Sequence, residues 1–374
     1  MNCIPILRNP GILSLEQVSC SKRTKSELFS GRKKLITENQ ESNIWQRSRV
    51  LVTGGAGFIG SALVWELNRR GCADLVVADF ATHAGKRGNL APLKFTDYVE
   101  PTVLLGRLQS GALGKFDFVF HLGACSSTTE TDEEFLRKNN FEYSRDLADW
   151  ALNHGVRFVY ASSAATYGDG RAGMDDIDPS LLERLQPLNP YGWSKHMMDL
   201  YARRQGWLER VVALKYFNVF GPNEEHKGDM RSVVRKSFTQ VQETGVIRLF
   251  KSYRPEYKHG EQRRDFLYVK DAVAMTLHLA ANRGAHGIFN IGSGETHTWN
   301  EVAGAVFAAL GKTPRVEYIE MPPEIRDQYQ YFTQADIRKL RAAGYTQPAT
   351  PLTEAVRDYV VNYLVPGIPL GARV

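Results

Sequence analysis

The feature that most constrains this chain is a glycine-rich turn between a short apolar run and an amphipathic stretch. The turn lies within residues 49–71, which read RVLVTGGAGFIGSALVWELNRRG. The pattern predicts a strand, a turn with Gly54, Gly57 and Gly60, and a helix that ends at Gly71. Glycines placed in this way let the backbone approach a pyrophosphate at the positive end of a helix, so the turn predicts a dinucleotide-binding site.

Further apolar runs rich in Val, Phe or Tyr follow, and helical patterns separate them. The runs are residues 74–79, 116–124, 155–163 and 210–218. Strands that alternate with helices predict an α/β fold with a Rossmann-type doubly wound parallel sheet. Asp79 ends the second strand, where a carboxylate meets the adenosine ribose hydroxyls of a dinucleotide.

The residues around Asp79 leave the choice of dinucleotide open. A carboxylate at this place favours NAD, because it repels the 2′-phosphate of NADP. Lys86 and Arg87 follow within one short loop and supply the opposite charge, which favours NADP.

The basic charge of the chain is concentrated in its first segment. The 374 residues carry a net charge of +6, and residues 1–50 hold nine Lys/Arg against four Glu, which leaves about +1 for the rest. A nucleic-acid-binding surface is basic in the folded domain itself, so we expect no nucleic-acid partner. We expect residues 1–47 to be a disordered extension, either a transit peptide or the product of a misassigned start codon.

The sequence lacks the usual features of membrane, secreted and metal-binding proteins. No apolar run approaches the ~20 residues of a membrane span, and the first residues lack a secretory signal. The four cysteines, Cys3, Cys20, Cys72 and Cys125, form no CxxC pair, which indicates free thiols in a reducing compartment. We therefore expect a cytoplasmic protein, and the absence of clustered metal ligands predicts no metal.

Tyr191 and Lys195 form a second motif. Asn189 suits a helix N-cap and Pro190 the first helical position, so a helix begins here and places Tyr191 and Lys195 on one face. A free tyrosine titrates near pH ~10, and a neighbouring ammonium lowers that pKa by favouring the phenolate. Ser163, at the end of an upstream run, can hydrogen-bond the reacting hydroxyl. We predict Ser163, Tyr191 and Lys195 as catalytic residues.

Together these residues resemble the extended short-chain dehydrogenase/reductases that act on nucleotide sugars. The stretch RDFLYVKD (264–271) is similar to the element that precedes their last core helix. More narrowly, residues 49 to about 364 resemble the ADP-L-glycero-D-manno-heptose 6-epimerases. The stretches that carry this resemblance are HLGACSSTTETD (121–132), YASSAATYGDG (160–170), YFNVFGPNEEHKG (216–228) and QYQYFTQADIRKLRAAGY (328–345). GACSSTTE and HKG are the most discriminating.

The resemblance implies bound NADP and assigns residues to it. Pro101 stands where some members have a second cofactor lysine, which keeps NAD as an alternative. The cofactor residues implied are Gly54, Gly57, Phe58, Ile59, Gly60, Asp79, Phe80, Lys86, Leu122, Gly123, Ala124, Cys125, Ser126, Asn139, Tyr191, Lys195, Val219 and Lys227.

The resemblance also implies an ADP-heptose substrate. Asp229 and Lys236 stand where other members can have a serine and a histidine, and both are expected to face the substrate. The insertion SYRPEYKHGEQ (252–262) lengthens the loop before Arg264. The substrate residues implied are Ser163, Asn218, Asp229, Lys236, Phe250, Lys251, Ser252, Tyr253, Arg264 and Tyr329.

Lys227 lies in a loop, where most lysines are only solvated. Carbon 6 of the heptose is a carbinol that no adjacent carbonyl acidifies, so its inversion needs oxidation to a ketone and return of the hydride to the other face. A cofactor fixed on one side makes the oxygen point differently in the two steps, so each step needs its own proton carrier. The resemblance assigns these roles to Tyr191 and Lys227. Which of the two serves which epimer stays open.

The expected activity is therefore that of an NADP-dependent ADP-glyceromanno-heptose 6-epimerase, an isomerase of lipopolysaccharide core biosynthesis. The resemblance implies a homo-oligomer, a pentamer. We expect residues 49–217 plus 265–300 to form the dinucleotide-binding domain, and residues 218–264 plus 301–374 a substrate-binding lobe.

Two alternatives stay open. The first is another nucleotide-sugar epimerase, reductase or dehydratase, although a dehydratase usually has an acidic pair in the region after Ser163, and residues 164–166 are Ala-Ala-Thr. The second is a cofactor-sensing binding protein with an inactive site. The intact set of Ser163, Tyr191 and Lys195 argues against it.

Overall fold

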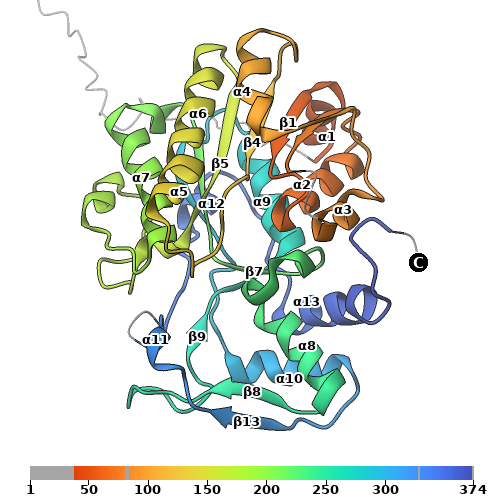
Figure 1. Ribbon diagram of the computed structural model, residues 1–374, viewed down its shortest axis with the longest axis vertical. Coiled ribbons are helices and arrows are strands. Elements are labelled where there is room, and N and C mark those ends of the chain that lie inside the picture. Colours follow the sequence, from red (N-terminus) through yellow and green to blue (C-terminus); the bar gives the residue numbers. More distant parts are fainter. Residues whose placement is uncertain (1–37, 81–83, 327–328, 373–374) are drawn as a thin grey trace, which may run out of the picture. The chain divides into compact units, whose positions relative to one another are not determined.

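A seven-stranded sheet forms the centre of the fold (Figure 1). The computed structural model describes residues 38–80, 84–326 and 329–372. All strand pairs of this sheet are parallel, in the order β11-β6-β5-β4-β1-β2-β3. The strands are β1 (Arg49–Thr53), β2 (Asp74–Ala78), β3 (Asp97–Val99), β4 (Phe118–His121), β5 (Arg157–Ser163), β6 (Val212–Tyr216) and β11 (Gly287–Ile291). The predicted Rossmann-type doubly wound sheet is confirmed.

Helices cover both faces of this sheet. One face carries α2 (Phe58–Arg69) and α9 (Val269–Ala281), and the other carries α4 (Pro101–Gln109), α6 (Tyr143–Asn153) and α7 (Pro190–Arg204). Successive strand side chains point to opposite faces, so Val50 and Val52 of β1 join the core under α2 while Leu51 joins the core under α6. Burial on both faces explains why β1 is continuously apolar.

The chain before β1 forms a helix, α1 (Glu38–Arg47). This corrects the predicted disordered extension over its C-terminal part, while residues 1–37 lie outside the described residues. Trp45 is fully buried, and its ring centroid lies 4.8 Å from that of Phe118 in β4. A single large buried ring stabilises the helix without producing an apolar period, so the pattern gave no signal.

Short strands pair outside the central sheet (Figure 1). The pairs are β7 (Asn218–Phe220) with β10 (Phe266–Tyr268), β8 (Ile247–Phe250) with β13 (Val316–Ile319), and β9 (Arg263–Arg264) with β12 (His297–Thr298). The helices α8 (Val233–Thr244), α10 (Trp299–Ala309) and α13 (Leu352–Tyr359) pack together beside them. The remaining short helices are α3 (Ala84–Leu90), α5 (Glu133–Leu136), α11 (Pro323–Arg326), α12 (Arg338–Ala342), η1 (Arg137–Glu142), η2 (Ala164–Tyr167), η3 (Pro179–Arg184), η4 (Trp207–Glu209), η5 (Glu225–Met230) and η6 (Val360–Leu364).

The predicted strand over residues 210–218 is divided in the structure. β6 ends at Tyr216, Phe217 N donates to Ile291 O (3.0 Å), and Asn218 N donates to Asp265 O (3.2 Å). The chain leaves the central sheet at this point, and β7 pairs with β10 instead. The apolar run continues through both strands and therefore conceals the break.

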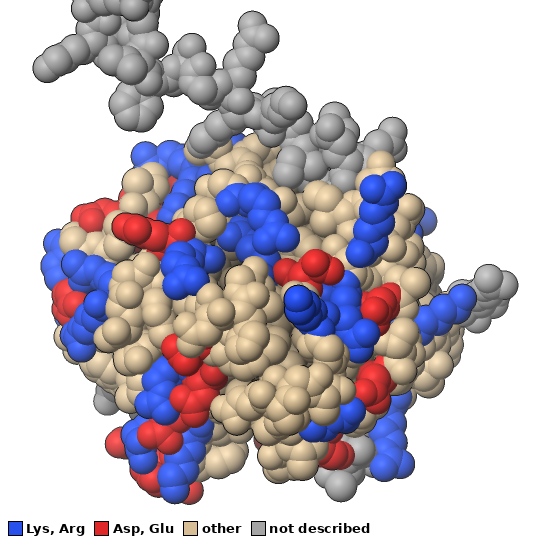
Figure 2. Space-filling model, turned by 90° about the horizontal axis from the view of Figure 1, so that it is seen from above, with Lys and Arg blue, Asp and Glu red and all other residues tan. Residues whose placement is uncertain are grey.

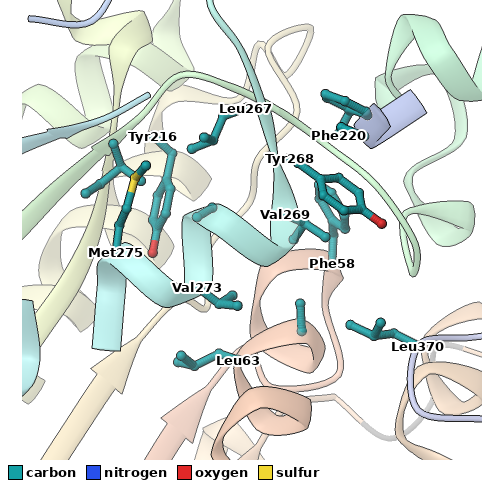
Figure 3. Close-up of a cluster of buried hydrophobic side chains, with 14 of the residues drawn as sticks. Phe58, Leu63, Tyr216, Phe220, Leu267, Tyr268, Val269, Val273, Met275 and Leu370 are labelled. Carbon is teal, nitrogen blue, oxygen red and sulfur yellow. The ribbon is translucent and has the colours of Figure 1, made fainter. Parts of the chain in front are cut away.

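An apolar junction joins the glycine turn to the elements outside the sheet (Figure 3). Phe58, at the start of α2, lies in the same buried cluster as Phe220, Tyr268 and Leu370. The ring centroids of Phe220 and Tyr268 are 5.6 Å apart. Residues 36–374 form one compact unit, and the division into a dinucleotide-binding domain and a substrate-binding lobe stays a prediction.

The surface seen in Figure 2 carries Lys and Arg side chains interspersed with Asp and Glu. Such a mixture differs from the one-sided basic face that nucleic-acid binding requires. Among the helices that the structure describes, none combines the length and the apolar character needed to cross a membrane.

Candidate active site

Several of the predicted site residues lie where the central strands end, among them Ser163 and the segment from Leu122 to Ser126. Thr53 and His121 are register partners at the ends of β1 and β4, and Ser163 ends the neighbouring β5. The carboxyl edge of a parallel sheet is where α/β folds bind their ligands. His121 Nδ1 lies 2.6 Å from Thr53 Oγ1 and its Nε2 2.8 Å from Ser144 Oγ, so this buried histidine has partners on both sides.

The glycine turn leaves no room for side chains. A Cβ at Gly54, where φ is +68°, would lie 2.5 Å from Gly123 N, and a Cβ at Gly60 would lie 2.0 Å from Gly54 O. The N-cap of α2 is Gly57, which has no side chain, so the first amide groups of the helix stay open to an anion. The residues present therefore fit the pyrophosphate of a dinucleotide.

Asp79 lies buried beside the glycine turn, and both of its carboxylate oxygens have partners within the protein. Oδ2 accepts from Ala56 N (3.0 Å), and Oδ1 accepts from Phe80 N (2.8 Å) and from Lys86 Nζ (3.1 Å). Lys86 thus neutralises the Asp79 carboxylate, and its role towards a cofactor stays a prediction. Phe80 is exposed beside it.

The segment Leu122 to Ser126 follows β4 and passes the glycine turn. Leu122 N donates to Thr53 O (3.1 Å), and Gly123 N donates to Thr53 Oγ1 (3.3 Å). These bonds hold the predicted cofactor segment against the end of β1.

Asn140 fixes this segment to the catalytic helix. It exchanges hydrogen bonds with the backbone of Cys125 (2.8 and 2.9 Å), and its Nδ2 donates to Ser194 Oγ in α7 (2.9 Å). The predicted Asn139 lies next to it and donates to Asn140 Oδ1 (2.9 Å). Both lie in η1, a π-helical turn of a kind often found at functional sites. Sequence reasoning missed Asn140, whose only signal was the asparagine pair.

The helix α7 begins as the sequence predicts. Asn189 Oδ1 accepts from Gly192 N (2.8 Å), and Pro190 is the first helical residue. Tyr191 therefore comes one turn before Lys195 on the same face. Ser163 hydrogen-bonds the Tyr191 side chain, so these two predicted catalytic groups are in contact.

The electrostatics of the pair follow from burial. Burial raises the pKa of Tyr191, and the hydrogen bond with Ser163 opposes this rise. Burial lowers the pKa of Lys195 to about 8, and the nearby Asp199 carboxylate opposes this fall. At neutral pH Lys195 still carries the positive charge that favours a Tyr191 phenolate.

Asp199, one turn after Lys195, fixes α7 to the sheet. Its Oδ1 accepts from Tyr160 OH (2.9 Å), and its Oδ2 accepts from Ser162 Oγ (2.7 Å) and pairs with Lys215 Nζ (3.1 Å). Asp199 and Lys215 are fully buried. Extra hydrogen bonds of this kind are what a buried ion pair needs. Sequence reasoning missed this group, because its members lie on three different elements.

Lys227 lies in η5, in the loop between β7 and α8. Its Nζ is 5.0 Å from the centroid of the Phe58 ring, so the side chain reaches the glycine turn. Burial lowers the pKa of Lys227, the Glu224 carboxylate opposes this fall, and the charge of Lys236 adds to it. This half-buried position differs from that of a freely solvated loop lysine.

Two asparagines that sequence reasoning missed anchor the Lys227 loop. Asn89 Nδ2 donates to Ala56 O (3.0 Å) in the glycine turn and to Asn223 O (3.1 Å) in the loop. Asn223 Nδ2 donates to Ser61 Oγ (3.0 Å), and its Oδ1 accepts from Leu370 N (2.8 Å). The backbone of Asn223 is left-handed, with φ +78°, a conformation that asparagine tolerates better than most residues.

Arg264 and Tyr329, both predicted substrate residues, come together. Arg264 Cζ lies 5.3 Å from the centroid of the Tyr329 ring and 5.8 Å from that of Trp299. Arg264 is buried, and its Nη1 donates to Arg263 O (3.0 Å). Within the described ranges no carboxylate forms an ion pair with it. A buried guanidinium in this state suits an anionic ligand such as a diphosphate.

The predicted substrate stretch from Phe250 to Tyr253 follows β8 and bonds largely to its own neighbours. Lys251 Nζ lies 2.6 Å from Glu320 Oε1, and Tyr253 OH donates to the same carboxylate. Arg326 Nη2 donates to Tyr253 OH (2.9 Å). In Figure 1 this stretch lies at the end of the molecule away from the central sheet. Glu320 is therefore the anion that joins these groups.

Four further predicted substrate and cofactor residues lie in β7, η5 and α8, the elements that precede, form and follow the Lys227 loop. Asn218 is exposed and accepts from Thr333 Oγ1 (3.3 Å), and Val219 pairs with Leu267 of β10. Asp229 in η5 and Lys236 in α8 are both exposed.

Cys72 and Cys125 are free thiols. In the part of the chain that the structure describes, no group of three His, Cys, Asp or Glu side chains is placed to hold a metal ion.

Solved structures of similar fold include several nucleotide-sugar enzymes. The Helicobacter pylori ADP-L-glycero-D-manno-heptose-6-epimerase matches 85% of this chain and 96% of its own, with 27% identity and a TM-score of 0.70. The Thermus thermophilus UDP-glucose 4-epimerase, solved as a complex with NAD, matches 84% of this chain and 98% of its own, with 30% identity and a TM-score of 0.67.

Sequence comparison gives stronger matches. The ADP-L-glycero-D-manno-heptose-6-epimerase of Nitratidesulfovibrio vulgaris is 49% identical over 320 residues, which cover 85% of this chain and 99% of the relative. That of Fusobacterium nucleatum is 43% identical, covering 84% and 98%. A sequence model of the NAD dependent epimerase/dehydratase family matches residues 50–292. The chain belongs to the NAD dependent epimerase/dehydratase family.

Proposed function

We propose that the protein interconverts ADP-D-glycero- and ADP-L-glycero-β-D-manno-heptose by inverting carbon 6. Two observations support the proposal: Tyr191 hydrogen-bonds Ser163 at the end of β5, and Lys227 reaches the Phe58 ring beside the glycine turn from another loop. The relatives that match the chain over most of its length carry the name of this activity.

The chemistry requires both carriers. A dinucleotide held by its pyrophosphate at the glycine turn would supply the hydride acceptor and donor for carbon 6. Ser163 and Tyr191 hold the substrate hydroxyl, and Tyr191 takes or returns its proton while Lys195 stabilises the phenolate. Lys227 does the same for the opposite orientation of the oxygen. Arg264 binds the diphosphate, which keeps the nucleotide end in place while the sugar end turns.

The test is incubation of the purified protein with ADP-D-glycero-β-D-manno-heptose in D₂O without added cofactor, followed by NMR. We expect the L-glycero epimer to form, with no deuterium at carbon 6, because the hydride returns to the carbon that it left. Deuterium at carbon 6 would indicate proton abstraction instead. A persistent ketone or no reaction would contradict the proposal.

Lys227→Met tests the second carrier. Methionine keeps the length and the apolar contact with the Phe58 ring but cannot carry a proton. We expect interconversion to fall by about 10²–10⁴-fold, with the cofactor still bound. One epimer should still reduce the cofactor in a single turnover, seen as the absorbance of the reduced nicotinamide. Lys258→Met, an exposed lysine outside the predicted set, is the control. Wild-type rates in Lys227→Met would show that Lys227 carries no proton in this reaction.

For the cofactor itself we propose NADP. The support is Asp79, whose charge Lys86 neutralises and whose two oxygens already have protein partners, so that it is poorly placed to repel a 2′-phosphate. Release of the cofactor by denaturation and its identification by mass spectrometry test this proposal. Lys86→Gln should weaken binding of NADP and leave binding of NAD unchanged. NAD as the released cofactor would contradict it.

A homo-oligomer, a pentamer by family resemblance, stays part of the proposal. Light scattering tests it. A pentamer has about five times the 42.1 kDa mass of the chain.

A further inference from the structure

Glu224 is a fully buried carboxylate three residues before Lys227, and the proposed chemistry gives it no role. It lies at the start of the loop that connects β7 to α8. Burying a carboxylate is costly unless hydrogen bonds or an opposite charge compensate. Its partners therefore show what holds it there.

The carboxylate of Glu224 joins the two ends of the Lys227 loop. At one end Gly221 N points to Oε1 at 3.5 Å, a weak contact. At the other end Ser232 donates twice, from its N to Oε2 and from its Oγ to Oε1, the latter at 2.6 Å. Tyr359 of α13 contributes a further side-chain hydrogen bond. Residues 221–232 thus form a closed loop with Glu224 as its clasp.

These partners also define the protonation state of Glu224. Ser232 Oγ accepts a hydrogen bond from Arg235 N (3.2 Å), so its own proton points to the carboxylate. The backbone amides of Gly221 and Ser232 can only donate. Burial raises the pKa of Glu224, and the charge of Lys227 and the bonds from Ser232 and Gly221 oppose this rise. Because these partners all donate, they stabilise the carboxylate in its ionised, accepting form.

Lys227 lies within the field of this charge. Its backbone N donates to Glu224 O (3.0 Å), and the two side chains attract each other electrostatically. The charge of Lys236 in α8 acts on Lys227 in the opposite direction. Glu225, next to Glu224, pairs with two arginines, with Arg231 at 2.9 Å and with Arg235 at 2.6 Å, so its charge is directed away from Lys227.

We propose that Glu224 is a positioning residue that clasps the Lys227 loop and supplies the negative charge that keeps Lys227 protonated. The inference rests on the proposed role of Lys227. A protonated lysine is the form that donates a proton to the ketone oxygen when the hydride returns on its side. Glu224 would thus fix the position of Lys227 and also favour its protonated form.

The test measures the protonation of Lys227 directly. Only a neutral lysine reacts with acetic anhydride, so the extent of acetylation against pH, read by mass spectrometry, gives the pH midpoint of each lysine. In the full chain carrying Glu224→Gln we expect the Lys227 midpoint to move down by about one pH unit. Glu225→Gln removes the same charge from the adjacent, exposed position and should leave the midpoint unchanged.

A purely structural role for Glu224 would not move the midpoint and would overturn the inference. So would equal shifts in Glu224→Gln and Glu225→Gln. If Glu224→Gln does not fold, Glu224→Asp decides: it keeps the acid but retracts it by one methylene, so the midpoint should move down by a smaller amount, and an unchanged midpoint would contradict the proposal.

Measurements of epimer interconversion distinguish a failure of this inference from a failure of the proposed function. If the wild-type protein does not interconvert the epimers, the proposed function fails, while acetylation still reports whether Glu224 charges Lys227. If the wild type is active, Glu224→Gln should lower interconversion by about tenfold, and the single-turnover reduction of the cofactor by the epimer that Tyr191 serves should be unchanged.

Discussion

The two proposed proton carriers are held in different ways. Tyr191 lies on α7, a regular helix that Asn189 caps and Asp199 fixes to β5 and β6. Lys227 lies on an irregular loop whose shape depends on side chains from other parts of the chain. Asn89 is one of them, 134 residues from the Asn223 carbonyl that it binds.

This difference shows which site residues can be predicted from a single sequence. Helical spacing alone places Tyr191 and Lys195 on one face, so a five-residue motif carries most of the information. A loop has no repeating geometry, and each of its bonds needs a separate partner. The helix-borne carrier should therefore tolerate distant changes, and the loop-borne carrier should be sensitive to them.

The largest effect tests the helix-borne carrier itself. Tyr191→Phe keeps the ring and removes the hydroxyl, so we expect kcat to fall by about 10²–10⁴-fold while the cofactor stays bound. NMR of epimer interconversion measures it. Tyr201→Phe removes a hydroxyl from the same helix, outside the predicted set, and should stay close to wild type. A loss of less than tenfold in Tyr191→Phe would show that another group carries this proton.

A smaller effect tests the loop-borne carrier through its support. Asn89→Ala removes the bonds to Ala56 O and Asn223 O, so Lys227 should be misplaced and interconversion should fall by about 10- to 100-fold. The single turnover of the epimer served by Tyr191 should be normal. Asn68→Ala loses a similar bond to Lys94 O at an exposed position and serves as the control. Equal losses for both epimers would remove the contrast between the carriers.

The next effect concerns pH. Because the pKa of Lys195 is lowered to about 8 by burial, its ammonium is lost as the pH rises through 8, and kcat should fall on the alkaline side. Arginine keeps its charge at this pH, so Lys195→Arg should move the alkaline limb to higher pH even if its maximal rate is lower. If the alkaline fall of kcat occurs at the same pH in Lys195→Arg as in the wild type, the titrating group is not Lys195, and Lys227 becomes a candidate.

The smallest effect concerns the start of α7. Asn189→Ala removes the cap bond to Gly192 N, which should lower the free energy of unfolding by about 1 kcal/mol, with only a small change in kcat. Urea denaturation measures the loss. Thr298→Ala removes the corresponding cap of α10 and should cost a similar amount without any effect on kcat. A large fall in kcat from Asn189→Ala alone would mean that the helix positions Tyr191 less firmly than we propose.

Much of the fold could be predicted because its local patterns agree with its tertiary structure. The strand predicted ahead of the glycine turn is observed as Arg49–Thr53. The start of α7 at Pro190 followed from its cap and its proline. Both depend on interactions within a few residues, and such interactions are visible in a single sequence.

What escaped prediction depends on contacts across the chain. Trp45 stabilises α1 by packing on Phe118, and no pattern around Trp45 reveals that partner. Asp199 and Glu224 were missed for the same reason, since a buried carboxylate is recognisable only once its donors are known. Glu320 likewise lies between Lys251 and Tyr253, a pairing between strands far apart in sequence.

The bonds of Asn89 and Asn223 have a consequence for how a sugar can be inverted here. They tie the loop of the proposed second carrier to Ala56 and Ser61 at the glycine turn, so this loop and the turn that would hold the cofactor keep a constant separation. Neither can travel to meet the other face of the ketone. On the proposed mechanism the ketone would therefore have to rotate between the two protein groups, and any analogue too bulky to rotate should be oxidised once and then remain trapped.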